Sequence, residues 1–352
     1  MSHVQLCSDQ DFMNLVAPEE KVDYSRKKML YSLGLEITNF CAGSCAYCFS
    51  SSDTTTDTIM PRQKVMELID EGAALQIREL ILTGGDALTH PNWEDFTAYG
   101  AEKGMKVALG TSFLISKELA RRVCQHDIGF LCSHIDTLDR EAYAQVHTNP
   151  KTLEAKIRGL HNLLDAGFPR ERIVILITLT RPILPSLQKT IDWYVDEIGI
   201  KYIGVLAAKG IGFGNSHREW EPSLTDFRQA HEYRAQKLGN QFLRIGVGDL
   251  GKFFCHTYFQ VHFDGHVSPC NTLRELSVGN VYEESLTRIF EKNRDFLLHH
   301  HEIKGKCGDC ENNDVCFGCR ANAFYYLGDV QASDPKCWLN PAAPEYCYSS
   351  KE

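Results

Sequence analysis

The sequence lacks any apolar run long enough to cross a membrane, since no stretch approaches the roughly 18 consecutive apolar residues of a spanning helix. It also lacks an excess of positive charge: 37 Lys and Arg residues stand against 46 Asp and Glu residues, a formal net charge of −9. This charge balance gives no sign of the excess positive charge by which proteins bind nucleic acid. The segment MSHVQLCSDQDF has no basic region followed by an apolar one, so no secretory signal is visible. We therefore expect a cytoplasmic protein without membrane or nucleic-acid partners.

Cysteine, in contrast, is abundant, with 14 in 352 residues. In a chain without a visible export signal, clustered cysteines are more often reduced metal ligands than disulfides. Metal clusters built on such thiolates are sensitive to oxygen, which predicts an anaerobic or strongly reducing setting. Apolar residues make up 43% of the chain, enough for a sizeable core in one large domain or two moderate ones.

Six short β-like runs alternate with helical patterns in the first two thirds of the chain. The strands are expected at 32–38, 78–84, 106–111, 130–136, 172–179 and 201–207. They are rich in Ile, Leu and Val and hardly alternate, as expected for strands buried on both faces. Six strand–helix units predict a parallel α/β sheet with right-handed crossovers, in the form of a partial (β/α)6 barrel. A doubly wound open sheet is the alternative that periodicity leaves open.

Two helices in this region have clear signals. Pro61 is expected to open one of them, because proline is favoured in the first turn. The other is predicted over 151–166, with Leu153, Ile157, Leu160 and Leu164 on its apolar face.

The pattern of predicted secondary structure changes near residue 240. The segment that follows reads as short strands and turns, with a hairpin signal at Asp264–Gly265. We predict an N-terminal extension (1–30), a partial-barrel domain (31–240) and a small Cys-rich domain with a β-hairpin and short helices (241–352). The histidines at 299–301 are expected on a helix surface rather than in a metal site.

Three closely spaced cysteines, Cys41, Cys45 and Cys48, follow the first predicted strand with the spacing C-x3-C-x2-C. Functional groups collect at the C-terminal ends of parallel strands, so this placement favours chemistry. Three thiolates can hold three corners of an iron–sulfur cube and leave the fourth iron open to bind another molecule. A zinc site or three unrelated thiols are the alternatives, although zinc usually takes four ligands in closed pairs.

Tyr47 precedes the third cysteine, and the string resembles the radical S-adenosylmethionine (SAM) signature, C-x3-C-x-aromatic-C. The resemblance implies that the open iron chelates SAM, that the reduced cluster donates one electron, and that a 5′-deoxyadenosyl radical abstracts a substrate hydrogen. The partial (β/α)6 barrel is also the core fold of that family. Gly84 and Gly85 match the family's GGE-like element near the SAM amino group, with Asp86 in place of the commoner Glu.

Polar residues at the ends of the third and fourth strands are candidates to bind the SAM ribose. Ser133 and Asp136 come first and Thr111 next. Each could equally satisfy loop backbone, as strand-end Ser and Thr often do. The glycine-rich stretch GIGFGN (210–215) is expected to form a loop on the substrate or adenosine side.

A second group of seven cysteines lies in the last third of the chain: Cys255, Cys270, Cys307, Cys310, Cys316, Cys319 and Cys337. The string CGDCENNDVCFGCRANAFYYLGDVQASDPKCW resembles the SPASM extension of radical SAM enzymes, with x2 where many members have x3 between the third and fourth clustered cysteines. The alternative is one or two zinc ribbons.

The resemblance implies two auxiliary [4Fe–4S] clusters and hence three clusters in all. Cys255, Cys270 and Cys319 would hold the first, and the other four cysteines the second. The first set lacks a fourth thiolate. His256, His262, Asp264, Cys347, substrate or water could supply that ligand.

Our leading functional expectation is a radical SAM oxidoreductase or maturase that oxidatively modifies a peptide or protein by hydrogen abstraction. We expect a flavodoxin- or ferredoxin-type electron donor. Since only about 30 residues precede the first strand, any peptide-recognition protein would be separate. One alternative is a small-metabolite enzyme, either a sugar or alcohol dehydrogenase or a tetrapyrrole side-chain decarboxylase. The GCRANAFYYLGD…DPKC string resembles the haem-pathway decarboxylases. The other alternative is a non-catalytic zinc-binding protein. The residues leave the substrate and the net reaction open.

Overall fold

The fold is a mostly parallel sheet wrapped by helices, described by a computed structural model over residues 7–247 and 250–346. The first six strands are β1 (Ser32–Thr38), β2 (Glu79–Gly84), β3 (Lys106–Gly110), β4 (Ile128–Ser133), β5 (Ile173–Leu179) and β6 (Tyr202–Ala207). They pair in parallel and in chain order, so the sheet runs β6-β5-β4-β3-β2-β1. The sheet does not close, and the predicted partial-barrel α/β fold is confirmed.

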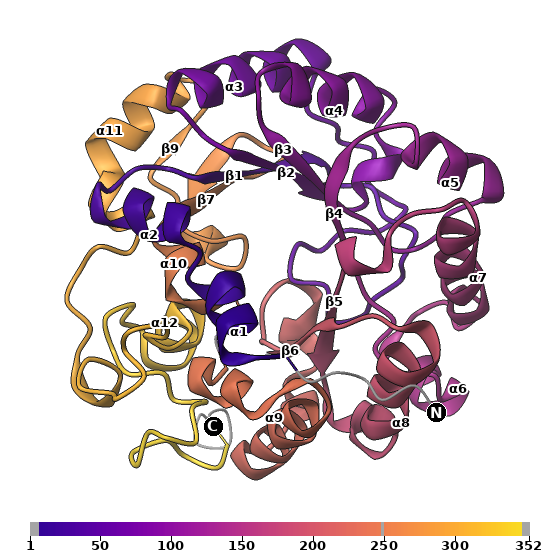
Figure 1. Cartoon of the computed structure of the whole chain (residues 1–352), viewed down its shortest axis with the longest axis vertical. Coiled ribbons are helices and arrows are strands. Elements are labelled where there is room, and N and C mark those ends of the chain that lie inside the picture. The colour runs from indigo at the N-terminus through magenta and orange to yellow at the C-terminus, as the bar shows by residue number, and fades with distance from the viewer. Residues whose placement is uncertain (1–6, 248–249, 347–352) are drawn as a thin grey trace.

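Helices cover the outside of the strands, as Figure 1 shows. They are α3 (Arg62–Ala74), α4 (Trp93–Glu102), α5 (Lys117–Val123), α6 (Arg140–Val146), α7 (Thr152–Asp165) and α8 (Leu187–Asp192), the last continuing as a π-helical turn over Trp193–Ile198. Pro61 directly precedes α3, as predicted. The strands between them bury all seven residues of β1 and alternate residues of β5, so the core lies between the sheet and this helical layer.

The fourth strand ends earlier than the sequence suggests, at Ser133 rather than 136. Beyond it, the backbone N–H of Ile135 donates to the Tyr194 hydroxyl (2.8 Å), which in turn donates to the Ile135 carbonyl (3.1 Å). Because the Tyr194 side chain satisfies both backbone groups of Ile135, the chain stops pairing with the neighbouring strands at this residue. His134 and Asp136 consequently lie in the loop above the strand.

The C-terminal segment extends the same sheet. β7 (Tyr258–Val261) pairs in parallel with β1, and β8 (His266–Ser268) and β9 (Gly279–Asn280) follow in antiparallel, giving nine strands. The predicted hairpin turn is present, with Gly265 in the left-handed region at φ 86°. The proposed boundary at residue 240 stays a prediction, since the sheet itself continues from β1 into β7.

The remaining helices surround this extension: α1 (Asp9–Val16), α2 (Glu19–Arg26), α9 (Leu224–Leu238), α10 (Gly251–Cys255), α11 (Leu286–Leu297) and α12 (Arg320–Leu327). Figure 1 shows α11 beside α3 at the edge of the barrel and α12 among the C-terminal loops. Within the described ranges, none of the helices is long and apolar enough to span a bilayer.

The expectation of a helix surface at residues 299–301 is wrong. α11 ends at Leu297, and His299 is 3% exposed with a left-handed backbone, φ 52°. The three histidines lie past the helix end and face a cavity instead.

Candidate functional site

The loop that carries Cys41, Cys45 and Cys48 lies beyond the C-terminal end of β1, where it is held against the segment after α6. The backbone N–H of Ala46 donates to the Val146 carbonyl (3.0 Å), and that of Thr148 donates to the Ser44 carbonyl (2.9 Å). These bonds fix the loop at the edge of the sheet where strand-end side chains converge.

The three thiols of this loop interact with one another electrostatically. Burial raises the pKa of Cys41, and the nearby Asp86 and Cys45 raise it further. Burial and Cys45 likewise raise the pKa of Cys48. Cys45 differs: although burial alone would raise its pKa, the neighbouring Lys156, His147 and His134 hold it well below the usual value. Cys45 is therefore the thiol that the protein itself prepares as a thiolate.

The Gly84–Gly85 pair is required by the close approach of β2's end to this loop. A Cβ at Gly85 would overlap the Phe40 carbonyl oxygen, and one at Gly84 (φ 135°) would overlap that of Thr38. The backbone N–H of Gly85 donates to the Thr38 carbonyl at 2.8 Å. Because both residues are glycine, the end of β2 packs directly against the residues that precede Cys41.

Asp86 joins the ends of β2 and β3. One carboxylate oxygen accepts hydrogen bonds from Thr111 Oγ1 (3.1 Å), Ser112 N (3.0 Å) and Ser112 Oγ (2.6 Å). The other accepts from the Leu88 backbone N–H at 3.1 Å. The Thr111 hydroxyl proton is thus engaged within the protein, which leaves only its lone pairs for a ribose. The roles of Asp86 and Thr111 toward SAM stay predictions.

Asp136 is the centre of a buried network above β4. It accepts hydrogen bonds from the hydroxyl of Tyr47 and from the Thr178 backbone N–H (2.9 Å), and it pairs with His134 Nδ1 (2.9 Å). Burial alone would raise the pKa of Asp136, but His134 and His147 hold it well below the usual value. Although burial alone would lower the pKa of His134, Asp136 and Cys45 raise it to about 9. The ribose role of Asp136 also stays a prediction.

Several polar groups beside the cysteine loop are buried without a hydrogen-bond partner in the described structure, among them Ser133 Oγ and Lys156 Nζ. Lys156 is completely buried on α7, and the charged or ionisable groups around it include Cys45, Tyr143 and Asp136. Burial alone would lower the pKa of Lys156, but Cys45, Tyr143 and Asp136 raise it, so the ammonium stays charged with hydrogen-bonding capacity unused. These two groups are therefore suited to a polar, partly anionic ligand such as the amino-acid end of SAM.

Of the predicted apolar face of α7, Leu153 and Leu160 are buried, and Ile157 and Leu164 are only partly buried. Lys156 and Leu163 are buried as well, and sequence reasoning missed Lys156. The available signal was a lysine three residues after Leu153 and four before Leu160, inside an apolar stripe.

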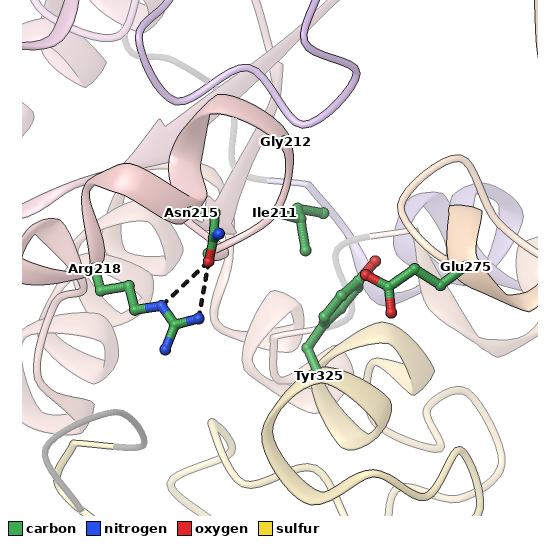
Figure 2. A pocket seen from close by; sticks show the side chains of 7 residues that line it. Ile211, Gly212, Asn215, Arg218, Glu275 and Tyr325 are labelled. Carbon is green, nitrogen blue, oxygen red and sulfur yellow. Dashed lines mark hydrogen bonds between the residues drawn. The ribbon is translucent and has the colours of Figure 1, made fainter. Parts of the chain in front are cut away.

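The glycine-rich loop after β6 packs against the cysteine loop. A Cβ at Gly212 (φ 53°) would collide with the Cys48 carbonyl, and the Phe213 backbone N–H donates to that carbonyl at 3.0 Å. On its other side this loop lines a cavity of about 380 Å³, shown in Figure 2.

That cavity lies between the barrel loops and the C-terminal segment. Figure 2 shows Asn215 and Arg218 on one side, with Arg218 Nη2 donating to Asn215 Oδ1 at 2.8 Å, and Glu275 and Tyr325 on the other. The Tyr325 hydroxyl donates to the carbonyl of Thr272 (2.9 Å), two residues from Cys270. The cavity therefore reaches from beside Cys48 toward the second cysteine group.

The structure brings together the cysteines of each predicted auxiliary set. Burial, Cys270 and Cys319 raise the pKa of Cys255 well above its usual value. Burial raises the pKa of Cys316 to about 12, with contributions from Cys307 and Cys310. Burial likewise raises that of Cys337 to about 12, with contributions from Cys307 and Cys316. Their roles as cluster ligands stay predictions. Across residues 7–247 and 250–346, no three His, Cys, Asp or Glu side chains are arranged to hold a single metal ion.

The candidates for the fourth ligand of the first auxiliary cluster differ in their existing hydrogen bonds and ionic contacts. His262 contacts Ser268 Oγ (2.7 Å) and Glu36 Oε2 (3.2 Å), and His256 Nδ1 contacts Ser25 Oγ (3.1 Å). Asp264 lies in the hairpin turn, 3.2 Å from His266. Cys347 falls outside the described residues.

Asp334, which sequence reasoning did not single out, bridges the two auxiliary sets. Its carboxylate accepts from the Cys319 backbone N–H (2.7 Å), and its own backbone N–H donates to the Cys307 sulfur (3.3 Å). The signal that could have found it is its place three residues before Cys337 in the DPKC string.

Comparison with known families decides the identity of the chain. The profile of the radical SAM superfamily matches residues 35–193, and that of an iron–sulfur cluster-binding domain, SPASM, matches residues 254–311. The chain is a radical SAM enzyme of the SPASM subfamily. The two matches support SAM and iron–sulfur clusters as cofactors of this radical SAM enzyme.

Relatives of this radical SAM enzyme include proteins of two substrate classes. An AdoMet-dependent heme synthase of Methanosarcina barkeri is 28% identical over 342 residues, which cover 87% of this chain and 95% of the relative. A PqqA peptide cyclase of Streptomyces rochei is 24% identical, over 87% of this chain and 89% of the relative. The relatives thus leave peptide and small-metabolite substrates both open.

Solved structures share the fold. SuiB of Streptococcus suis bound to its precursor peptide SuiA superposes with a TM-score of 0.66 at 15% identity, covering 93% of this chain and 81% of SuiB. The enzyme anSMEcpe with bound AdoMet and a peptide gives 0.64 at 15% identity, covering 86% of this chain and 92% of that enzyme. At such identity the likeness concerns the fold alone.

Proposed function

We propose that this enzyme cleaves SAM reductively and oxidatively modifies, by hydrogen abstraction, a substrate bound in the cavity of Figure 2. Cys41, Cys45 and Cys48 would hold the SAM-binding cluster. When bound, this cluster and SAM supply one-electron reduction and a hydrogen-abstracting radical. The observation that carries the proposal is the position of the cavity, with the loop of Cys48 at one end and Thr272, beside Cys270, at the other.

The residues around the first cluster fit SAM by their unsatisfied groups. Lys156 Nζ and Ser133 Oγ, both buried and without a hydrogen-bond partner in the described ranges, would bind the carboxylate of SAM. Tyr47, next to Cys48 in the chain, is held by the hydrogen bond from its hydroxyl to Asp136. The Gly84–Gly85 turn keeps the backbone of β2 in contact with the loop, so the site is rigid before SAM enters.

The auxiliary sets would accept or relay the electron that leaves the substrate. Cys255, Cys270 and Cys319 are the set nearer the cavity, because Tyr325 connects the cavity to Thr272. The other set, which includes Cys307 and Cys316, is tied to the first by Asp334. With one SAM-binding and two auxiliary clusters, the chain would carry three [4Fe–4S] clusters. A flavodoxin- or ferredoxin-type protein would reduce the first of them.

For the substrate we favour the small-metabolite class, and within it a carboxylate-bearing tetrapyrrole. The support is the match to heme synthases, which extends over 95% of the first relative's length, together with the Arg218 guanidinium at the cavity. Guanidinium groups recognise carboxylates by charge-assisted, often bidentate, hydrogen bonds. A peptide or protein substrate is the second candidate. It is favoured by the match to peptide cyclases, and a separate peptide-recognition protein would accompany it.

Anaerobic reconstitution followed by SAM cleavage assays tests this proposal. The enzyme, dithionite and SAM are incubated with iron coproporphyrin III or with candidate peptides, and 5′-deoxyadenosine and substrate mass are measured. We expect tetrapyrrole-dependent stimulation and a loss of mass from its side chains. Stimulation by a peptide alone would transfer the assignment to the second candidate. Zinc without labile sulfide in the purified protein would contradict the enzyme proposal.

The Arg218→Gln variant tests the carboxylate contact. Because one charge-assisted hydrogen bond contributes about 1.5–3 kcal/mol, the substrate KM should rise about 10- to 100-fold. Iron content and uncoupled SAM cleavage should stay unchanged. Arg228→Gln is the matched control, since Arg228 is exposed on α9 and pairs with Glu232. An unchanged KM in Arg218→Gln would remove this residue from the substrate site.

A further inference from the structure

A buried arginine, Arg320, lies where the two auxiliary cysteine sets meet. It follows Cys319 directly, begins α12 and is 3% exposed. Arginine is almost never buried to this degree unless a charged group pairs with it. Neither the proposed SAM site nor the proposed substrate cavity uses this side chain, so its burial needs another explanation.

Within the described ranges, the guanidinium is held by backbone carbonyls alone. Nε donates to Gly318 (3.4 Å), Nη1 to Val330 and Ala332 (2.8 Å each), and Nη2 to Phe317 (2.5 Å). A guanidinium has five N–H groups, and these bonds use all of them except one N–H of Nη2. Because carbonyls carry only partial charges, they do not neutralise the full positive charge of Arg320.

The nitrogen with the unused N–H lies beside a cysteine of the second auxiliary set. Gly318 adopts the left-handed region at φ 73°, and a Cβ added there would be 2.8 Å from Arg320 Nη2 and 2.9 Å from Cys307 Sγ. Both atoms therefore lie around the same point. Since glycine has no side chain, nothing at this position separates the guanidinium from the thiol.

Asp334 also lies beside this point, with its own Cβ 2.7 Å from the added atom. Its carboxylate accepts from the backbone N–H groups of Cys319 (2.7 Å) and Lys336 (2.8 Å). Across the parts of the chain that the structure describes, Arg320 forms no ion pair, with Asp334 or with another carboxylate. The site thus holds a fixed cation whose charge and one N–H are both unused.

An iron–sulfur cluster fits these two unused features. A [4Fe–4S] cluster bound by four thiolates carries negative charge, and its sulfurs accept hydrogen bonds. Reduction adds one electron and hence one more unit of negative charge. A buried cation a few ångströms away, together with a hydrogen bond to sulfur, therefore favours the reduced form.

We infer that Arg320 donates its remaining N–H to a sulfur of the second auxiliary cluster, the one that includes Cys307, and that its charge raises the reduction potential of this cluster. Arg320 touches no substrate and acts through the cluster. The inference rests on the proposed function for the presence of the auxiliary clusters. It adds a direction to their relay, because a higher potential at the second cluster favours transfer of the electron from the first.

A redox titration of the reconstituted full-length enzyme, followed by EPR, tests the effect on the potential. The signal of the SAM-binding cluster is recognised by its change when SAM is added, and the remaining signals are auxiliary. In Arg320→Gln, the ratio of reduced to oxidised auxiliary cluster at the wild-type midpoint should fall at least about tenfold, a shift of about 59 mV for a one-electron couple. Arg320→Lys keeps the charge and should shift the midpoint less than Arg320→Gln does.

Arg288→Gln is the matched control, because Arg288 is exposed on α11 and pairs with Glu284. It should leave every midpoint unchanged. An unchanged auxiliary midpoint in Arg320→Gln at full iron content, or equal shifts in Arg320→Gln and Arg320→Lys, would overturn the inference. A wild-type enzyme with no auxiliary EPR signal would contradict the proposed function instead, and the iron content would show this before any potential is measured.

A second measurement decides the question even if Arg320→Gln fails to assemble its auxiliary clusters. The wild-type enzyme is produced with arginine labelled with ¹⁵N in the guanidino group only, and the reduced enzyme is studied by pulsed EPR. We expect a weak ¹⁵N coupling to an auxiliary cluster, which disappears in Arg320→Lys and persists in Arg288→Gln. Absence of this coupling in the wild type would overturn the inference.

Discussion

Among single residues, Lys156 is the most unusual, because its ammonium is completely buried and has no hydrogen-bond partner in the described structure. Burial alone would lower the pKa of Lys156, but Cys45, Tyr143 and Asp136 raise it, so these groups hold the ammonium in its charged form. A buried charge whose hydrogen-bonding capacity is still unused is a mark of function rather than of packing.

The Lys156→Met variant tests the contribution of this charge to the fold and to SAM binding. Because Cys45, Tyr143 and Asp136 raise the pKa of Lys156, removal of the charge should destabilise the cluster-free protein by about 3–5 kcal/mol in urea denaturation. The reconstituted variant should bind SAM at least tenfold more weakly, measured by equilibrium dialysis. Lys151→Met, an exposed lysine at the start of the same helix, should change neither property. A cluster-free variant that is more stable than the wild type would mean that the buried charge is a net cost to the fold.

Gly85 is a second position at which a single added atom should disturb the site. An added Cβ would overlap the Phe40 carbonyl oxygen, and the backbone there cannot yield without moving the cysteine loop. Gly85→Ala should lower stability by about 1–3 kcal/mol and reduce iron incorporation at the first cluster, as measured by EPR of the reduced protein. Gly110→Ala is the control, because its Cβ would meet Thr83 at an ordinary 3.4 Å. Normal iron incorporation in Gly85→Ala would show that the loop tolerates displacement.

At the scale of elements, a buried ion pair joins β1 to the segment that carries Cys270. Glu36 on β1 contacts Arg274 Nη1 (2.6 Å) and His262 Nδ1 (3.2 Å). His262 in turn contacts Ser268 Oγ (2.7 Å), which donates to the Cys270 carbonyl. The strand that leads to the first cysteine loop thus also positions a cysteine of the second group.

The Glu36→Gln variant tests this connection. Burial alone would raise the pKa of Glu36, but His262 and Arg274 lower it below the ordinary 4.5. A lowered pKa means that the carboxylate stabilises the fold above pH 4.5 and that this contribution is lost as the pH falls through the folded-state pKa. At pH 7 the variant should lose about 3–5 kcal/mol in urea denaturation, and the difference from wild type should shrink below pH 4.5.

The control for this prediction is Glu232→Gln, which removes a carboxylate from an exposed pair on α9 and should cost at most about 1 kcal/mol. A loss in Glu36→Gln that stays constant between pH 7 and pH 3 would show that packing, and not the charge, is responsible.

The elements that the sequence predicts well are those whose signal is local. Each of the six strands is a short apolar run, and Cys41, Cys45 and Cys48 lie within one loop. Glu36 and His262 are 226 positions apart, so no window of sequence contains both. Leu153 and Leu160 of α7 are buried as predicted, but Lys156 was missed, because helical periodicity alone does not predict a buried lysine. His299 was assigned to a surface because its burial depends on the C-terminal segment that folds over it.

On the scale of the whole molecule, the sheet connects the two cysteine groups. Strands β1 and β7 are paired neighbours, so the loop after one and the residues before the other belong to a single rigid layer. The cavity of Figure 2 spans the gap between the barrel loops and the C-terminal segment, and its lining comes from both. Loss of the first cluster should nevertheless leave the auxiliary clusters in place, since the loop of Cys41, Cys45 and Cys48 is held by its own bonds to Val146 and Thr148.

The Cys41→Ala/Cys45→Ala/Cys48→Ala triple variant tests this independence together with the assignment of the catalytic cluster. The wild-type enzyme, with three [4Fe–4S] clusters, should contain about twelve irons per chain, and the variant about eight. The variant should keep the absorbance of its auxiliary clusters but produce no 5′-deoxyadenosine under dithionite. Production of 5′-deoxyadenosine by the triple variant would show that another cysteine set binds SAM. Loss of all iron would show instead that the clusters assemble cooperatively through the shared sheet.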